Sequence, residues 1–114
     1  MINDKNTVIQ KLKEEIEKFN NDREWKQYHC PKNLVMKIAI EAAELMEYFQ
    51  WTNTEDSWDV KEPTLQKIKD EIADVIICTL NLSNILNIDV SNAVIEKIKK
   101  NEQKYPVDLV KGKA

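Results

Sequence analysis

The sequence predicts an all-α fold, in which four helices pack into a bundle within a single domain of residues 1–114. Only one glycine and three prolines occur in the chain, a composition typical of helical proteins with few tight turns. Apolar residues recur three and four positions apart along four segments of about 15 to 25 residues. The connections between these segments are short, and four such helices make a bundle.

The first predicted helix runs to about Trp25. Thr7 is its expected N-cap, with Gln10 in the capping-box position. Its apolar side carries residues at helical spacing, namely Val8, Leu12, Ile16 and Phe19. The sequence around Pro31 ends the helix, because the residue before a proline disfavours the α region.

The second predicted helix runs from about Asn33 to Gln50 and is apolar on most of its faces, as expected of a buried helix. A polar, acidic connection follows over residues 52–59. The third helix extends to about Leu86, and Pro63 fits its first turn, where the missing N–H costs nothing.

The fourth predicted helix runs from about Val90 to Lys104, with Asp89 as its N-cap. Pro106 stops it, and we expect residues 107–114 to form a frayed tail.

Two pairs of carboxylates lie in otherwise apolar segments, three residues apart within each pair. Glu41 and Glu44 share one face of the second helix, and Glu71 and Asp74 share one face of the third. Removing water from an unpaired carboxylate is costly, so facing pairs in a core predict a positive charge between them. A divalent metal is the simplest candidate.

The ligand types narrow the choice of metal. Oxygen ligands without histidine or cysteine favour Mg²⁺, with Mn²⁺ as a substitute, and Mg²⁺ often completes its shell with substrate phosphates. A di-iron bundle is disfavoured, because it needs a Glu-x-x-His motif on each of two helices and His29 is the only histidine. A structural alternative stays open: Lys37 and Lys67 lie four residues before Glu41 and Glu71 and would neutralise part of the charge.

Composition argues against several classes of protein. The net charge is −3 with both signs interspersed, so the chain lacks the basic footprint of a nucleic-acid-binding protein. Cys30 and Cys78 have no neighbouring histidine cluster, which favours reduced thiols over a zinc site. The sequence shows neither an apolar signal region nor an apolar run long enough to span a membrane, and it predicts a cytoplasmic protein with no membrane partner.

Four sequence elements together carry a resemblance to a known family. They are R-E-W-K-Q-Y-H at 23–29, E-A-A-E-L-M-E-Y-F-Q-W at 41–51, D-E-I-A-D-V-I at 70–76 and N-E-Q-K-Y-P-V at 101–107. In this order, over about residues 19–107, the chain resembles the MazG-like all-α nucleoside triphosphate pyrophosphohydrolases, and within them the dCTP pyrophosphatase branch. One departure is that the glycines common around the first carboxylate pair are replaced by Ile40, Ala42 and Ala43, which should alter helix packing but not ligation.

The resemblance implies Mg²⁺-dependent hydrolysis of an NTP or dNTP, with dCTP or a modified pyrimidine nucleotide among the candidates, to the monophosphate and pyrophosphate. It implies that the metal ligands are Glu41, Glu44, Glu71 and Asp74. Glu47, or one of these ligands, would take the proton of the attacking water. It also implies a homodimer or homotetramer, with the pocket built partly by a neighbour, and the apolar second helix independently suggests such an interface.

Substrate contacts are expected from both ends of the chain. Lys97, Asn101 and Lys104 share a face near the end of the fourth helix and would hold phosphates, with Tyr105 beside them in the family element. Trp25, His29 and Trp51 are candidates for a base pocket, where an aromatic ring stacks and a histidine contacts the base edge.

Two other classes of function remain open from the sequence. A non-catalytic bundle that binds nucleotide or a protein partner predicts tight binding without turnover. A purely structural bundle with incidental carboxylates predicts no response to metal or nucleotide.

Overall fold

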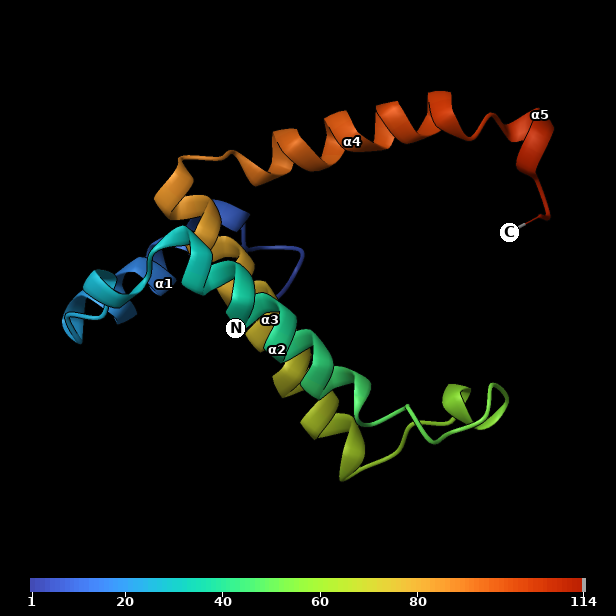
Figure 1. Ribbon diagram of the computed structural model, residues 1–114, viewed down its shortest axis with the longest axis horizontal. Coiled ribbons are helices and arrows are strands. Elements are labelled where there is room, and N and C mark those ends of the chain that lie inside the picture. The colour runs from blue at the N-terminus through green and yellow to red at the C-terminus, as the bar shows by residue number, and fades with distance from the viewer. Residues whose placement is uncertain (114) are drawn as a thin grey trace.

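The computed structural model describes residues 1–113, and within them it contains α-helices and short 3₁₀ turns but no strand (Figure 1). This confirms the predicted all-α class. The α-helices are α1 (Ile9–Asp22), α2 (Pro31–Met46), α3 (Thr64–Leu86), α4 (Val90–Lys104) and α5 (Val107–Val110). The 3₁₀ turns are η1 (Lys26–Tyr28) and η2 (Asp56–Trp58).

The start of α1 differs from the prediction. Val8 is the N-cap, and the helix has no side-chain cap, because a valine side chain has no acceptor. The Thr7 hydroxyl lies one residue earlier and donates to Asn6 Oδ1 at 2.7 Å. The helix also ends at Asp22, three residues before the predicted end. Glu24 then adopts a left-handed conformation with φ of 55°, and the Trp25 N–H donates to Asn20 O at 3.0 Å. These turns redirect Trp25 out of the helix.

Helix α2 begins two residues before its predicted start, because Pro31 occupies the first turn, where a fixed φ suits the helix. It ends at Met46, four residues short of the predicted end. Residues 47–51 form turns, in which the Gln50 N–H donates to Met46 O at 3.0 Å.

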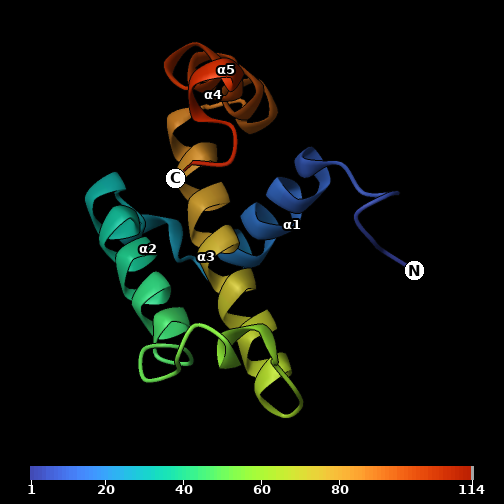
Figure 2. The same ribbon diagram turned by 90° about the vertical axis from the view of Figure 1, so that its right-hand side faces the viewer.

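Helix α3 is the centre of the fold. Helix α2 lies antiparallel along it, and α1 packs against its C-terminal half (Figures 1 and 2). The buried apolar side chains are few and come mainly from these two paired helices: Leu34, Ile68, Cys78 and Leu80. The core therefore runs along the α2–α3 contact, where the carboxylate pairs also lie.

Helix α4 has the predicted bounds and the predicted cap, since Asp89 Oδ1 accepts from the Asn92 N–H at 2.8 Å. It leaves α3 at a bend of 103° and projects away from the other helices (Figures 1 and 2). Its apolar side chains Val94, Ile95 and Ile98 are about half exposed as a result. The fourth helix thus does not close the bundle within one chain.

The predicted frayed tail is partly wrong. Residues 107–110 form α5, whose last N–H, on Val110, donates to Pro106 O at 3.2 Å. Pro106 stops α4 as expected and is also the N-cap of this short helix, where the N–H that proline lacks would have no partner within the helix. Ala114, the last residue of the predicted tail, lies outside the described residues.

No one helix among residues 1–113 is both long and apolar enough to cross a membrane. The same test of length and composition is met only by α3 and α4 taken together as a bent pair.

Candidate metal centre and adjoining cavity

Three of the four predicted carboxylates converge between the paired helices. One oxygen from each of Glu41 and Glu44 on α2 and Glu71 on α3 lies within 4.8 Å of the other two. The i, i+3 spacing turns the α2 pair toward α3, and the antiparallel packing places Glu71 opposite that pair. Such a group of oxygens has the chemistry of a hard-cation site.

Asp74 lies one turn beyond Glu71 on α3 and outside this group of three. Its negative charge still acts on Glu41, and its side chain borders the cavity described below. The fourth predicted ligand therefore stands between the carboxylate cluster and the cavity.

The charge of the cluster is poorly compensated by the described residues. Glu41 is buried, and Oε2 of Glu41 and Oε2 of Glu71 are both buried without a hydrogen-bond partner. Lys37 Nζ lies 3.7 Å from Glu41 Oε1, but the lysine side chain is 58% exposed, so water screens the pair. Lys67 makes no ion pair with Glu71 in the described part of the chain. Two buried oxygens without partners have the chemistry to hold a divalent cation between them.

Burial raises the pKa of Glu41 above its ordinary value. A hydrogen bond to Glu44 and the negative charges of Glu44 and Asp74 raise this pKa further, and Lys37 opposes them. The metal-free cluster therefore favours a proton on Glu41, whereas a bound cation would favour the carboxylate.

This pKa shift predicts how stability depends on pH without metal. The folded protein holds a proton on Glu41 above pH 4.5, the ordinary value, so stability falls as pH rises from there through the raised pKa. Glu41→Gln should remove this loss and unfold at a higher midpoint than wild type at neutral pH in EDTA. Thermal unfolding followed by circular dichroism across this range, in EDTA, measures the difference.

A matched control is Glu14→Gln, an exposed position on α1 whose carboxylate accepts a hydrogen bond from Gln10 at 3.5 Å. Its pH profile should follow wild type. Parallel profiles for wild type and Glu41→Gln would contradict the raised pKa.

A cavity of about 690 Å³ opens beside the carboxylates, between α1, the start of α2 and the C-terminal half of α3. Trp25 and His29, two of the predicted base-pocket residues, line it together with Asp74 and Lys37. The Trp25 ring meets the Phe19 ring edge to face, with centroids 5.7 Å apart. The cavity therefore combines an aromatic wall with a charged edge next to the cluster.

Sequence reasoning missed several residues that line this cavity. Asn20 on α1 and Asn81 on α3 are each 8% exposed, and Asn81 Nδ2 lies 3.1 Å from His29 Nδ1. The sequence did carry a signal for these two residues, because each is a polar residue on an apolar helix face. Asn20 lies four residues after Ile16, and Asn81 lies three residues after Cys78.

The cysteine nearest the cluster is a buried free thiol. Cys78 lies one turn after Asp74 and lines the cavity, whereas Cys30 is exposed. Burial raises the pKa of the Cys78 thiol, and the charges of Glu41 and Asp74 add to the effect. The Cys78 thiol is therefore neutral where it lines the cavity.

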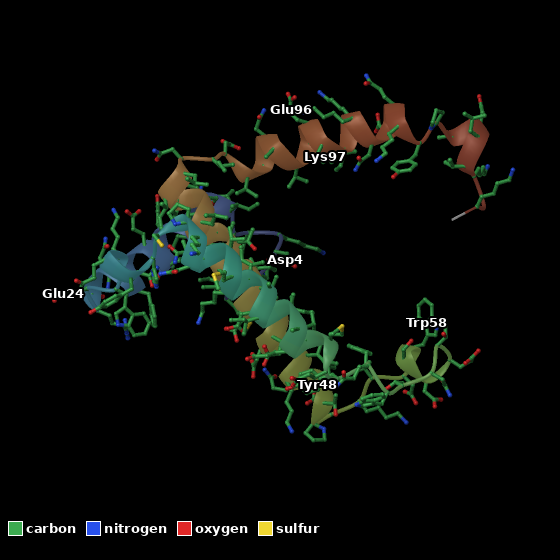
Figure 3. All side chains as sticks on the ribbon, in the orientation of Figure 1. Asp4, Glu24, Tyr48, Trp58, Glu96 and Lys97 are labelled. Atoms are coloured by element: carbon green, nitrogen blue, oxygen red, sulfur yellow. The ribbon has the colours of Figure 1, made fainter. Side chains whose placement is uncertain are left out.

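The other predicted site residues lie apart from the cluster in this chain. Trp51 is 90% exposed beyond the end of α2, and Glu47 is the exposed C-cap of that helix. The phosphate-binding candidates on or beside α4 do not line the cavity, and Figure 3 shows Lys97 far from α2 and α3. They are Lys97, Asn101, Lys104 and Tyr105. Their roles stay predictions.

Comparison with known proteins bears on these features. A model of the MazG-like family matches residues 36–113, which include all four carboxylates. The chain is 38% identical over 100 residues to dCTP pyrophosphatase 1 of Mus musculus, and 31% identical over 98 residues to that of Homo sapiens. These matches cover 84% and 82% of the chain but only 58% and 56% of the relatives, so the chain spans little more than half their length.

A solved structure matches the fold over nearly its whole length. It is the crystal structure of a pyrophosphatase from Archaeoglobus fulgidus, 39% identical, with a TM-score of 0.82. The match covers 93% of this chain and 99% of that one.

Proposed function

The chain belongs to the MazG-like family, and on that premise we propose that it is a Mg²⁺-dependent nucleotide pyrophosphohydrolase. It would cleave an NTP or dNTP to the monophosphate and pyrophosphate, with dCTP or a modified pyrimidine nucleotide as the first candidates. The relatives named dCTP pyrophosphatase 1 support the substrate class.

The observation that carries this proposal is the pair of buried carboxylate oxygens without partners, on Glu41 and Glu71. They belong to an all-oxygen cluster, which suits Mg²⁺ or Mn²⁺. Glu41, Glu44, Glu71 and Asp74 would hold the metal. When bound, the metal would neutralise phosphate charge and lower the pKa of a water.

The side chains of the chain would do the remaining work. In the proposed reaction a water oxygen bonds to the α-phosphorus, the bond to the bridging oxygen breaks, and pyrophosphate leaves with that oxygen. Glu47 or one of the four carboxylates would accept the proton of the water. Trp25 and His29 would hold the base in the cavity, which Asp74 joins to the cluster.

We also propose that the protein acts as a homodimer or homotetramer in the cytoplasm, with residues 1–114 as one domain in each subunit. Apolar side chains on α2, α3 and α4 are about half exposed, which leaves apolar surface on these helices for a second copy to cover. Lys97, Asn101 and Lys104 project from the uncovered α4, so this helix would deliver them to the site of a neighbouring subunit. Trp51 would reach the base pocket in the same way.

The direct test is pyrophosphate release from a panel of canonical and modified nucleoside triphosphates. We expect release from at least one of them in Mg²⁺, with monophosphate as the co-product, and none in EDTA. Absence of release from every nucleotide in Mg²⁺ and Mn²⁺ would contradict the proposal.

Thermal unfolding separates an enzyme from a structural bundle. Mg²⁺ with a substrate nucleotide at 100 times its Kd should stabilise the native state by about 2.7 kcal/mol, raising the midpoint by on the order of 10 °C. Differential scanning fluorimetry measures this shift. An unchanged midpoint favours the structural bundle, and a raised midpoint without turnover favours a non-catalytic binding module.

A further inference from the structure

His29 is held by a side chain from a distant part of the chain. It lies in the connection between η1 and α2, and Asn81 on α3 reaches it with Nδ2 3.1 Å from Nδ1. Asn81 is 8% exposed and fixed within the longest helix of the fold. This hydrogen bond therefore sets the ring of a predicted base-pocket residue from a rigid support.

The chemistry of the two nitrogens determines where the ring proton lies. An amide nitrogen only donates, so His29 Nδ1 must accept with its lone pair. In a neutral imidazole the other nitrogen then carries the hydrogen. With Nδ1 engaged by Asn81, the Nε2–H is the ring donor left for a ligand.

We propose that Asn81 is a positioning residue that keeps His29 in the Nε2–H tautomer, so that the cavity offers a hydrogen-bond donor to an acceptor atom of the substrate base. That the ligand is a nucleotide rests on the proposed function. The ligand class is a planar, neutral heterocycle with a ring carbonyl or ring nitrogen as acceptor, which describes the edge of a nucleobase.

A second observation points to a ligand at the same place. Asn20, on α1, is also 8% exposed and lines the cavity, yet its side chain makes no hydrogen bond with the other residues described. The amide atoms of Asn20 are not fully buried, so they are open to hydrogen bonds from a ligand or water in the cavity. Asn20 and His29 thus add polar groups to the cavity that Phe19 and Trp25 also line.

Substitutions at position 81 would change the tautomer in predictable directions. In Asn81→Asp the new carboxylate only accepts, so Nδ1 would carry the hydrogen and Nε2 would become an acceptor. In Asn81→Ala neither nitrogen is held, and the two tautomers should mix.

Nitrogen-15 NMR reads this directly, because the chain contains one histidine and therefore one imidazole signal set. At about pH 8, where imidazole side chains are neutral, the free protein should show a protonated Nε2 and an unprotonated Nδ1. Asn81→Asp should reverse this pattern. A protonated Nδ1 in wild type, or an unchanged pattern in Asn81→Asp, would overturn the assignment.

Kinetics test the consequence for binding. Asn81→Ala should raise KM by about three- to tenfold with little change in kcat, as expected when one neutral hydrogen bond to the substrate is weakened. Thr79→Ala is the control, because Thr79 lies on the same helix and its hydroxyl donates to Val75 O at 2.8 Å without lining the cavity. It should leave both KM and the His29 signals unchanged.

The outcomes separate the two proposals. The NMR pattern is recorded without nucleotide, so it decides the role of Asn81 even if no triphosphate is hydrolysed and the proposed function fails. An altered tautomer in Asn81→Asp with an unchanged KM would refute the part of the inference that concerns substrate recognition.

Discussion

Glu71→Gln should lower kcat for pyrophosphate release by more than about a hundredfold, since even the outer partners of metal ligands are worth about 10- to 100-fold. Glu71 supplies α3's oxygen to the cluster with Glu41 and Glu44, and its Oε2 is buried without a partner. An amide keeps the size of the side chain but removes the charge that would hold the metal. Steady-state pyrophosphate release in saturating Mg²⁺ measures the loss.

The same variant should not be less stable than wild type in EDTA, because it relieves repulsion between unpaired buried carboxylates. That combination distinguishes lost ligation from lost folding. Glu14→Gln, exposed on α1, is the matched control and should keep full activity. Wild-type turnover in Glu71→Gln would show that the cluster is not the metal centre.

Glu47→Gln in the same assay ranks the candidate bases. Glu47 is exposed at the end of α2 and lies outside the group of three. A loss as large as that of Glu71→Gln would assign it the proton of the water, and a small loss would leave that role to one of the four buried or half-buried carboxylates.

The carboxylate cluster was predictable because its geometry is local. Spacing of three residues fixes which side chains share a helix face. Helices α2 and α3 also lie antiparallel, although residues 47–63 connect them. Together these bring Glu41 and Glu44 against Glu71, as the structure shows. The offset of Asp74 was not predictable, since it depends on the relative height of the two helices.

The direction of α4 is the main feature that the sequence did not predict. Its bounds follow from local signals, the Asp89 cap and Pro106. Its direction follows from a three-residue connection in which Asn87 takes a left-handed conformation with φ of 54°. Asparagine tolerates this conformation but does not require it, so the connection by itself does not fix the direction of α4.

The cavity residues Asn20 and Asn81 were missed for a related reason, because their role depends on contacts between helices.

The exposed side of α4 leads to the second large expected effect. Ile95 and Ile98 are 54% and 47% exposed, so about half of each side chain is open to solvent within one chain. Burying the remaining surface against a second copy would gain about 1 kcal/mol for each side chain, or about 4 kcal/mol over two positions in two subunits. The double variant Ile95→Asn/Ile98→Asn should therefore weaken dimerisation by about a thousandfold. Sedimentation velocity at micromolar concentration measures the change.

The same double variant should also lose activity. Lys97 and Asn101 lie beside this apolar side of α4, so docking of the helix on a second subunit is what would bring them to that subunit's carboxylates. The control, Glu96→Asn/Gln103→Asn, introduces the same residue type on the same helix away from the apolar side and should stay oligomeric and active. A monomeric wild type would contradict the interface. An active, monomeric double variant would show that one chain holds the whole site.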